Sequence, residues 1–81
     1  MLKLYQAEWC PYCARVRSKM TDLEITYINV NVPRMKADRK ELTEVSGQGG
    51  IPTLVTEDGK IIADDDQAII EYLEKSYGRM V

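Results

Sequence analysis

The two cysteines of this chain lie three residues apart, in the sequence Cys10-Pro11-Tyr12-Cys13. The thiolate form of cysteine attacks sulfur, and the free backbone N–H groups at the start of a helix stabilise that form. Positions i and i+3 of a helix are neighbours, so Cys13 could attack a mixed disulfide on Cys10 and release the bound thiol. The motif therefore predicts thiol–disulfide exchange, with Cys10 as an exposed nucleophile and Cys13 as a shielded resolving thiol.

Other uses of a cysteine pair fit this sequence less well. With two cysteines and no histidine, one chain lacks the ligands of a structural zinc site. A disulfide between such close positions closes almost no loop and would add little stability. Two buried, unreactive cysteines remain as the alternative. Pro11 argues against it, because proline suits the first turn of a helix and so places the pair at a helix start.

A strand and a helix are predicted on either side of the motif. The alternation in KLYQ favours a strand over roughly residues 2–6, and a helix should continue from Pro11 to about Leu23. Apolar residues at helical spacing predict an inner face for this helix, with basic residues on the outer face. The inner face contains Cys13, Val16, Met20 and Leu23, and the outer face contains Arg15, Arg17 and Lys19.

The remaining chain predicts two strand-forming segments and two further helices. In order, these are a strand at 25–32, a helix at about 34–45, a hairpin within 49–63 and a helix at 63–78. Gly47 is a plausible C-terminal cap, and Asp58-Gly59 is a hairpin signal. The inner face of the last helix should contain Ala68, Ile69, Tyr72 and Leu73.

The order of elements, β-α-β-α-β-β-α, predicts an α/β fold. Strands joined through a helix are expected to be parallel, and the hairpin is antiparallel, so the four-stranded sheet should be mixed. Three helices should cover both of its faces. We expect a single domain over residues 1–81.

A proline stands where the third strand should begin. Proline within a sheet is confined to strand starts, edges and bulges, and cis peptide bonds occur mostly before proline. A trans bond is the commoner state. Beside a cysteine pair in an α/β fold, we instead expect a cis Ile51-Pro52 bond. It would turn the Ile51 backbone outward beside the dithiol, where it could pair with a peptide-like substrate.

The composition limits the possible partners and locations. Apolar residues make up 44% of the chain, charged residues 30%, and the net charge is -2. That balance is typical of a globular domain and lacks the basic face of a nucleic-acid-binding protein. No apolar stretch approaches the roughly 18–20 residues that span a bilayer, and the N-terminus leads directly into a strand pattern. We therefore expect a cytoplasmic protein without a membrane or nucleic-acid partner.

At these residues the chain resembles the glutaredoxins. CPYC at 10–13 is the dithiol motif of that family, and RKELTEVSGQGGIP (39–52) is similar to its second helix, loop and cis-proline. DDDQAIIEYL (64–73) is similar to the last glutaredoxin helix and to the N-terminal domain of glutathione transferases. The resemblance covers nearly the whole chain. It implies a thioredoxin fold and a thiol–disulfide oxidoreductase without a tightly bound cofactor, using glutathione or a related thiol as co-substrate.

The resemblance also implies a set of site residues. Cys10 would be the nucleophile and Cys13 the resolving cysteine. The implied glutathione contacts are Ile51 and Pro52 for the cysteinyl part, Asp65 and Asp66 for the γ-glutamyl end, Arg39 and Gln48 for the glycine carboxylate, and Tyr12 beside the sulfur. Simple N-capping is the alternative role for the aspartates, and a solvated helix face is the alternative for Arg39.

Three positions depart from the glutaredoxin pattern. Glu8 is acidic where many glutaredoxins are not, and Ile62-Ala63 replaces a glycine pair. Trp9 before the dithiol is similar to thioredoxins, which prefer protein disulfides, although it could also simply pack on the helix end.

Four functions therefore remain in view. The first is a glutathione-dependent reductase of protein disulfides and glutathione mixed disulfides, acting as a monomer. The second is a thioredoxin-like reductase that receives electrons from a flavoprotein disulfide reductase. The third is a module that bridges an iron–sulfur cluster between two chains, which Pro11 disfavours. The fourth is a transferase-type domain lacking its helical partner, which we rank low because the sequence contains no linker into a second domain.

Overall fold

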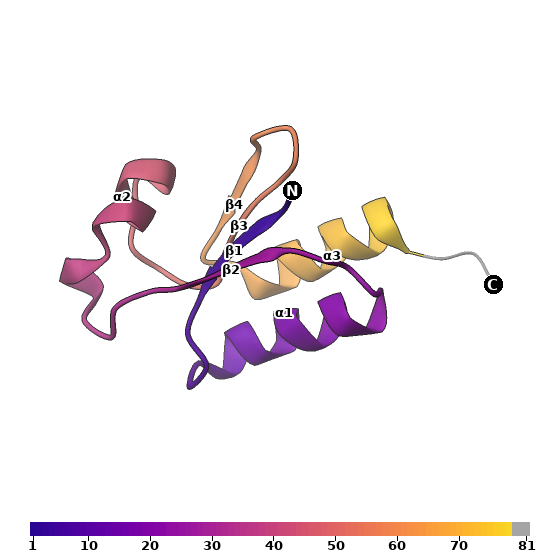
Figure 1. Cartoon of the computed structure of the whole chain (residues 1–81), viewed down its shortest axis with the longest axis horizontal. Helices are drawn as coiled ribbons and strands as arrows, with labels where there is room; N and C mark the ends of the chain where they lie inside the picture. Colours follow the sequence, from indigo (N-terminus) through magenta and orange to yellow (C-terminus); the bar gives the residue numbers. More distant parts are fainter. Residues whose placement is uncertain (79–81) are drawn as a thin grey trace.

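The computed structural model describes residues 1–78 as four strands, three α-helices and one 3₁₀ helix (Figure 1). In chain order these are β1 (Lys3–Gln6), α1 (Pro11–Asp22), β2 (Ile28–Asn31), the 3₁₀ helix (Lys36–Asp38), α2 (Lys40–Ser46), β3 (Thr53–Val55), β4 (Ile61–Ala63) and α3 (Asp66–Tyr77). This is the thioredoxin fold, with the predicted β-α-β-α-β-β-α order. No helix within residues 1–78 is both long and apolar enough to cross a membrane.

The four strands form one mixed sheet in the order β2-β1-β3-β4. β1 pairs in parallel with β2 and antiparallel with β3, and β3 pairs antiparallel with β4. The β3–β4 turn includes the predicted Asp58-Gly59. The Thr56 N–H donates to the Lys60 carbonyl at 2.8 Å, and Gly59 takes a φ of 86° that glycine adopts without strain. The mixed sheet and its hairpin are confirmed.

Helices lie on both faces of the sheet. Successive side chains of a strand point to opposite faces, and β1 shows this directly. Leu4 packs in the main core with Val16 of α1 and Ile69 of α3. Tyr5 instead faces α2, where its hydroxyl donates to Glu41 Oε2 at 2.7 Å. Figure 1 shows α1 and α3 side by side, with α2 separate from them.

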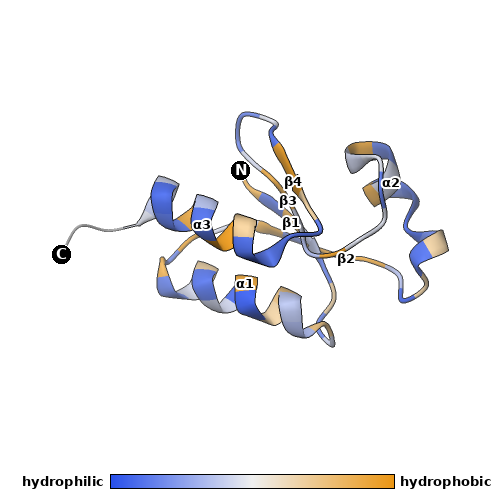
Figure 2. Ribbon diagram, turned by 180° about the vertical axis from the view of Figure 1, so that it is seen from behind, coloured by the Kyte–Doolittle hydropathy of each residue, from blue (hydrophilic) through white to orange (hydrophobic). Residues whose placement is uncertain are grey.

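The main hydrophobic core lies between the sheet and the α1–α3 pair. Its buried members are Leu2, Leu4, Val16, Met20, Leu54, Ile69, Ile70 and Leu73. Figure 2 shows apolar and polar residues interleaved along α1 and α3, as amphipathic helices require. Ile70 is buried although it was not predicted for the inner face, whereas Ala68 and Tyr72 are only half-buried. The inner face of α3 is therefore rotated slightly from the predicted one.

The last helix was predicted at 63–78, and its predicted start is wrong: α3 begins at Asp66, because residue 63 still belongs to β4.

Two other predicted boundaries are also wrong. β2 starts at Ile28 because the preceding segment still closes the end of α1: the Ile25 N–H donates to the Met20 carbonyl at 2.9 Å. The helix predicted at 34–45 is interrupted at Arg39, whose φ of -85° and ψ of 64° are not helical. Gly47 ends α2 in the left-handed conformation, as predicted for a C-terminal cap.

The basic face of α1 is not simply solvated. Lys19 Nζ lies 2.9 Å from Glu74 Oε2 of α3, and Arg15 pairs with Asp66 at the start of α3. Arg17 faces the loop that follows β1. All three basic residues predicted for an outer face therefore join α1 to neighbouring segments.

Candidate active site

Cys10 is the N-cap residue of α1, as its position before Pro11 predicted. Its backbone is extended, and its Sγ accepts the backbone N–H of Cys13 at 3.4 Å. The Cys10 N–H donates in turn to the Ala7 carbonyl at 3.2 Å. The sulfur thus faces the free N–H groups and the positive end of the helix dipole, which stabilise a negative charge there.

Cys10 is more enclosed than the sequence predicted. It is only 6% exposed, so the prediction of an exposed nucleophile is wrong. It packs with Ala7 and Cys13, and Ile51 packs against this small cluster, which is separate from the main core. The enclosing contact comes from a residue distant in sequence. Cys10 is therefore surrounded mainly by protein groups rather than by bulk water.

Cys13 lies one turn further into α1 and is fully buried, as expected for a shielded thiol. Burial is the main cause that raises the pKa of Cys13, from 9.0 to about 12, and Cys10 raises it further through a hydrogen bond and its charge. A backbone hydrogen bond from Ala7 and the positive charge of Arg17 act in the opposite direction. Cys13 therefore depends on its neighbours to become a nucleophile.

The Ile51-Pro52 peptide bond is cis, as predicted. The loop before it is held by the Gln48 side chain, whose Oε1 accepts the Gly50 N–H at 2.5 Å and whose Nε2 donates to Thr53 Oγ1 at 3.2 Å. The Gln48 amide, predicted to contact glutathione, therefore bonds to the loop itself. It keeps Ile51 in contact with the dithiol cluster.

A cavity of about 160 Å³ borders this loop. It is lined by Tyr12, Ile51, Pro52, Asp64 and Asp66. Four of these were predicted site residues; Asp64 was not. Asp64 lies so close to Gly50 that any side chain at Gly50 would clash with it. The φ of Asp64 is 52°, a left-handed conformation that aspartate tolerates better than most residues.

The two aspartates predicted to bind the γ-glutamyl end have different surroundings. Asp65 is the N-cap of α3, and its Oδ1 accepts the Ala68 N–H at 3.0 Å. The capping alternative therefore accounts for Asp65. Asp66 lines the cavity and forms an ion pair with Arg15 of α1, which the sequence did not connect with the site. A ligand ammonium at Asp66 would share the carboxylate with Arg15.

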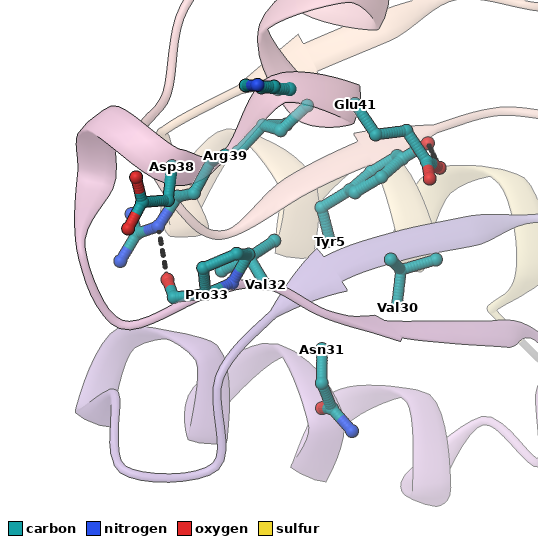
Figure 3. A pocket seen from close by; sticks show the side chains of 10 residues that line it. Tyr5, Val30, Asn31, Val32, Pro33, Asp38, Arg39 and Glu41 are labelled. Carbon is teal, nitrogen blue, oxygen red and sulfur yellow. Dashed lines mark hydrogen bonds between the residues drawn. The ribbon is translucent and has the colours of Figure 1, made fainter.

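Arg39 lies at a different cavity. Figure 3 shows that cavity, about 190 Å³ in volume, with Arg39 beside Pro33 and with Tyr5 and Glu41 in its lining. Arg39 is 6% exposed, so the alternative of a solvated helix face is wrong. Its Nε, Nη1 and Nη2 donate to the carbonyls of Pro33, Gly49 and Arg34 at 2.8, 2.9 and 3.0 Å. Arg39 therefore joins the segment before α2 to the loop after it. This geometry does not support the predicted contact with a glycine carboxylate.

The residues just before the dithiol face outwards. Trp9 is 51% exposed, and the Arg34 guanidinium lies 4.9 Å from its ring centre, a cation–π distance. The Glu8 carboxylate accepts from Gln6 Nε2 at 3.0 Å and lies 3.5 Å from Arg17 Nε. Its charge is thus paired with a cation.

Residues 4–80 match the family model of the glutathione S-transferase N-terminal domain. The chain belongs to this family. A relative described as an uncharacterized glutaredoxin-like 8.6 kDa protein in the rubredoxin operon of Clostridium pasteurianum is 32% identical over 73 residues, which are 90% of this chain and 96% of that protein. Glutathione S-transferase Z2 of Arabidopsis thaliana is 37% identical over 79 residues, covering 94% of this chain and 34% of the transferase.

Among solved structures, glutathione transferase E6 from Drosophila melanogaster matches this transferase-type domain with a TM-score of 0.84 and 34% identity. The match covers 99% of this chain and 36% of the Drosophila chain. The domain therefore spans about a third of the transferases and nearly all of the clostridial protein. These matches confirm the thioredoxin-fold superfamily. The narrower assignment to dithiol glutaredoxins, the monomeric state and a flavoprotein partner stay predictions.

Proposed function

We propose that this domain is a dithiol thiol–disulfide oxidoreductase that reduces protein disulfides or glutathione mixed disulfides. The observation that carries the proposal is the placement of the two sulfurs. Cys10 Sγ accepts the Cys13 N–H at the start of α1, with Cys13 buried one turn further in. The nucleophile is supported by the helix, and the second thiol is protected until a mixed disulfide forms beside it.

The reaction would proceed in two exchanges. The Cys10 thiolate attacks one sulfur of the substrate disulfide, forms a mixed disulfide and releases the other sulfur as a thiolate. The Cys13 thiolate then attacks Cys10 Sγ, forms the Cys10–Cys13 disulfide and releases the second substrate thiolate. The dithiol loses two electrons and two protons, and the substrate disulfide gains them. Two molecules of glutathione, or of a related thiol, would return the protein to the dithiol form.

Several contacts support glutathione as the reductant. The cavity that borders the Ile51-Pro52 loop is lined by Tyr12 of the CPYC motif, by Ile51 and by Asp66 at the start of α3. A helix N-terminus favours a carboxylate, and Asp66 would attract an ammonium group. The plant and Drosophila relatives are named as glutathione transferases, which supports a glutathione-related thiol for this domain.

The test compares two reductants and two variants. With glutathione and glutathione reductase, the wild-type protein should reduce both a glutathionylated peptide and a protein disulfide. Cys10→Ser should lose both activities, whereas Cys13→Ser should lose only the second, because release of glutathione from Cys10 needs no resolving thiol. Equal losses in the two assays for Cys13→Ser would contradict the assigned roles. Absence of turnover with any thiol reductant would reject the proposed function.

A second candidate is a thioredoxin-like reductase of protein disulfides. The observation that favours it is that Arg39 and Gln48 bond to the backbone instead of pointing towards the dithiol cavity. The exposed Trp9 ring also offers a contact surface for a protein. Turnover that requires thioredoxin reductase and is not supported by glutathione would select this candidate.

A further inference from the structure

Arg17 ties α1 to the loop between β1 and the dithiol. Its side chain is 23% exposed. Nη1 donates to the Ala7 carbonyl at 3.3 Å, Nη2 donates to the Glu8 carbonyl at 3.4 Å, and Nε lies 3.5 Å from Glu8 Oε2. One guanidinium group therefore bonds to two consecutive peptide units just before Cys10. This use of a planar fork is specific to arginine, because a lysine ammonium cannot reproduce its spacing.

A buried amide extends this attachment into the sheet. Gln6 is fully buried, and its Oε1 accepts a hydrogen bond from Arg17 Nη1. Its Nε2 donates to Asn31 Oδ1 of β2 at 2.7 Å and to Glu8 Oε2 at 3.0 Å. Buried polar groups are retained where their partners are satisfied, and satisfied networks are rigid. The guanidinium of Arg17 is therefore fixed relative to β1 and β2.

The Ala7 peptide is where this network meets the two cysteines. Its carbonyl accepts both the Cys10 N–H, at 3.2 Å, and Arg17. Its backbone also bonds to the Cys13 thiol and favours the thiolate, as does the nearby positive charge of Arg17. A shift of this loop would therefore alter the surroundings of Cys13, the thiol that is fully buried and has no access to water.

We propose that Arg17 is a positioning residue for the resolving step, holding the Ala7 backbone against the two cysteines that it packs with. The inference rests on the proposed function and names a residue on which its second exchange depends. In that step Cys13 Sγ forms a bond to Cys10 Sγ, and the bond from Cys10 Sγ to the substrate sulfur breaks. The leaving thiolate takes the electron pair. The proton lost by Cys13 passes to that thiolate or to solvent, since Arg17 stays protonated throughout.

The first exchange should depend less on Arg17. Cys10 Sγ is supported by the Cys13 N–H and the start of α1, and no hydrogen bond joins Arg17 to the Cys10 side chain in the described structure. Loss of Arg17 should therefore separate the rates of the two exchanges. A residue that merely maintained the fold would slow both.

The test measures each exchange separately in single turnovers. Release of a coloured aromatic thiol from a mixed disulfide on Cys10 reports the resolving step. Attack on a symmetrical aromatic disulfide in a Cys13→Ser background reports the first step. Arg17→Met should slow the resolving step about tenfold and move its pH–rate inflection upwards, while the first step changes less than about twofold. Arg17→Lys keeps the charge and should restore the inflection but only part of the rate.

Lys19→Met is the matched control, because Lys19 also lies on α1 and pairs with α3 instead of the loop. It should leave both rates unchanged. If Arg17→Met does not fold, as judged by circular dichroism, Arg17→Gln takes its place with the same expectation. Equal slowing of both steps, or an unchanged resolving rate in a folded neutral variant, would overturn the role of Arg17. Failure of the wild-type protein to release the thiol at all would instead reject the proposed function.

Discussion

Removing the Cys10 sulfur should make Cys13 easier to ionise. In the reduced protein, burial above all raises the pKa of Cys13 from 9.0 to about 12, and the hydrogen bond and charge of Cys10 add to the rise. Such a rise lowers the thiolate fraction at neutral pH about a thousandfold. Cys10→Ala removes both contributions of Cys10 and leaves burial, the Ala7 hydrogen bond and the Arg17 charge in place. The pKa of Cys13 should therefore fall below about 12 but stay above 9.0.

The same change occurs naturally when Cys10 enters a mixed disulfide, since its sulfur then carries no charge. The resolving thiol would thus become more acidic at the moment when it is needed. Each unit by which its pKa falls gives about ten times more thiolate at a fixed pH below the inflection. Burial and a nearby negative charge both favour the neutral form of a thiol and raise its pKa. When the Cys10 sulfur loses its negative charge, Cys13 should therefore ionise at a lower pH.

The assay is a pH titration of the Cys13 Cβ resonance in isotopically labelled protein, comparing wild type with Cys10→Ala over the range in which circular dichroism shows a folded chain. Tyr5 is an internal control. Burial and its hydrogen bond to Glu41 raise the pKa of Tyr5 to about 12, and this value should be the same in both proteins. Coincident Cys13 curves would show that Cys10 does not influence the resolving thiol. A wild-type inflection at or below 9.0 would refute the dominant effect of burial.

Two further predictions test the reassigned site residues. Asp65→Ala should lower the free energy of unfolding by about 1 kcal/mol through loss of the α3 cap, as measured by denaturation curves. Asp66→Asn should chiefly raise the KM for a glutathionylated peptide, by about tenfold, as measured by steady-state kinetics. A larger effect on KM at Asp65 than at Asp66 would contradict the assignment. Arg39→Gln should lower the free energy of unfolding by about 1–3 kcal/mol, because three part-buried carbonyls lose their donors, and it should have little effect on that KM. A stable variant with a raised KM would instead support the contact of Arg39 with the glycine carboxylate.

Features that depend on neighbouring residues in sequence could be predicted well. The Cys10 cap follows from Pro11 and the strand before it, and the left-handed end of α2 follows from Gly47. The order of elements and the mixed sheet follow from periodicity and connection length. These expectations needed only local chemistry or one topological rule. The cis bond before Pro52 is different: proline alone favours trans, and the prediction of cis depended on the expected α/β fold with a cysteine pair.

Features that depend on distant contacts could not be predicted. The enclosure of Cys10 is completed by Ile51, which sits in the loop before β3. The sequence around Arg39 is typical of an exposed helix face. In the structure its guanidinium donates to three backbone carbonyls and is buried, and its backbone is not helical, so the predicted helix is interrupted there. Three successive aspartates look alike in sequence. Asp65 caps α3 through a local bond from the Ala68 N–H, whereas tertiary packing places Asp64 and Asp66 in the lining of the cavity. The choice among capping, pairing and binding roles is made by neighbours outside the segment.

The two arginines of α1 show how one helix can be fixed from both sides. Residues two apart on a helix point in different directions, so Arg15 reaches Asp66 of α3 and Arg17 reaches the loop after β1. Both attachments lie within the first two turns of α1, next to the cap that carries Cys10. Exchange between two sulfurs requires a small and constant separation, and a helix end free to fray would lose it. The charges predicted to form a solvated face therefore tie the start of α1 to α3 on one side and to the loop after β1 on the other.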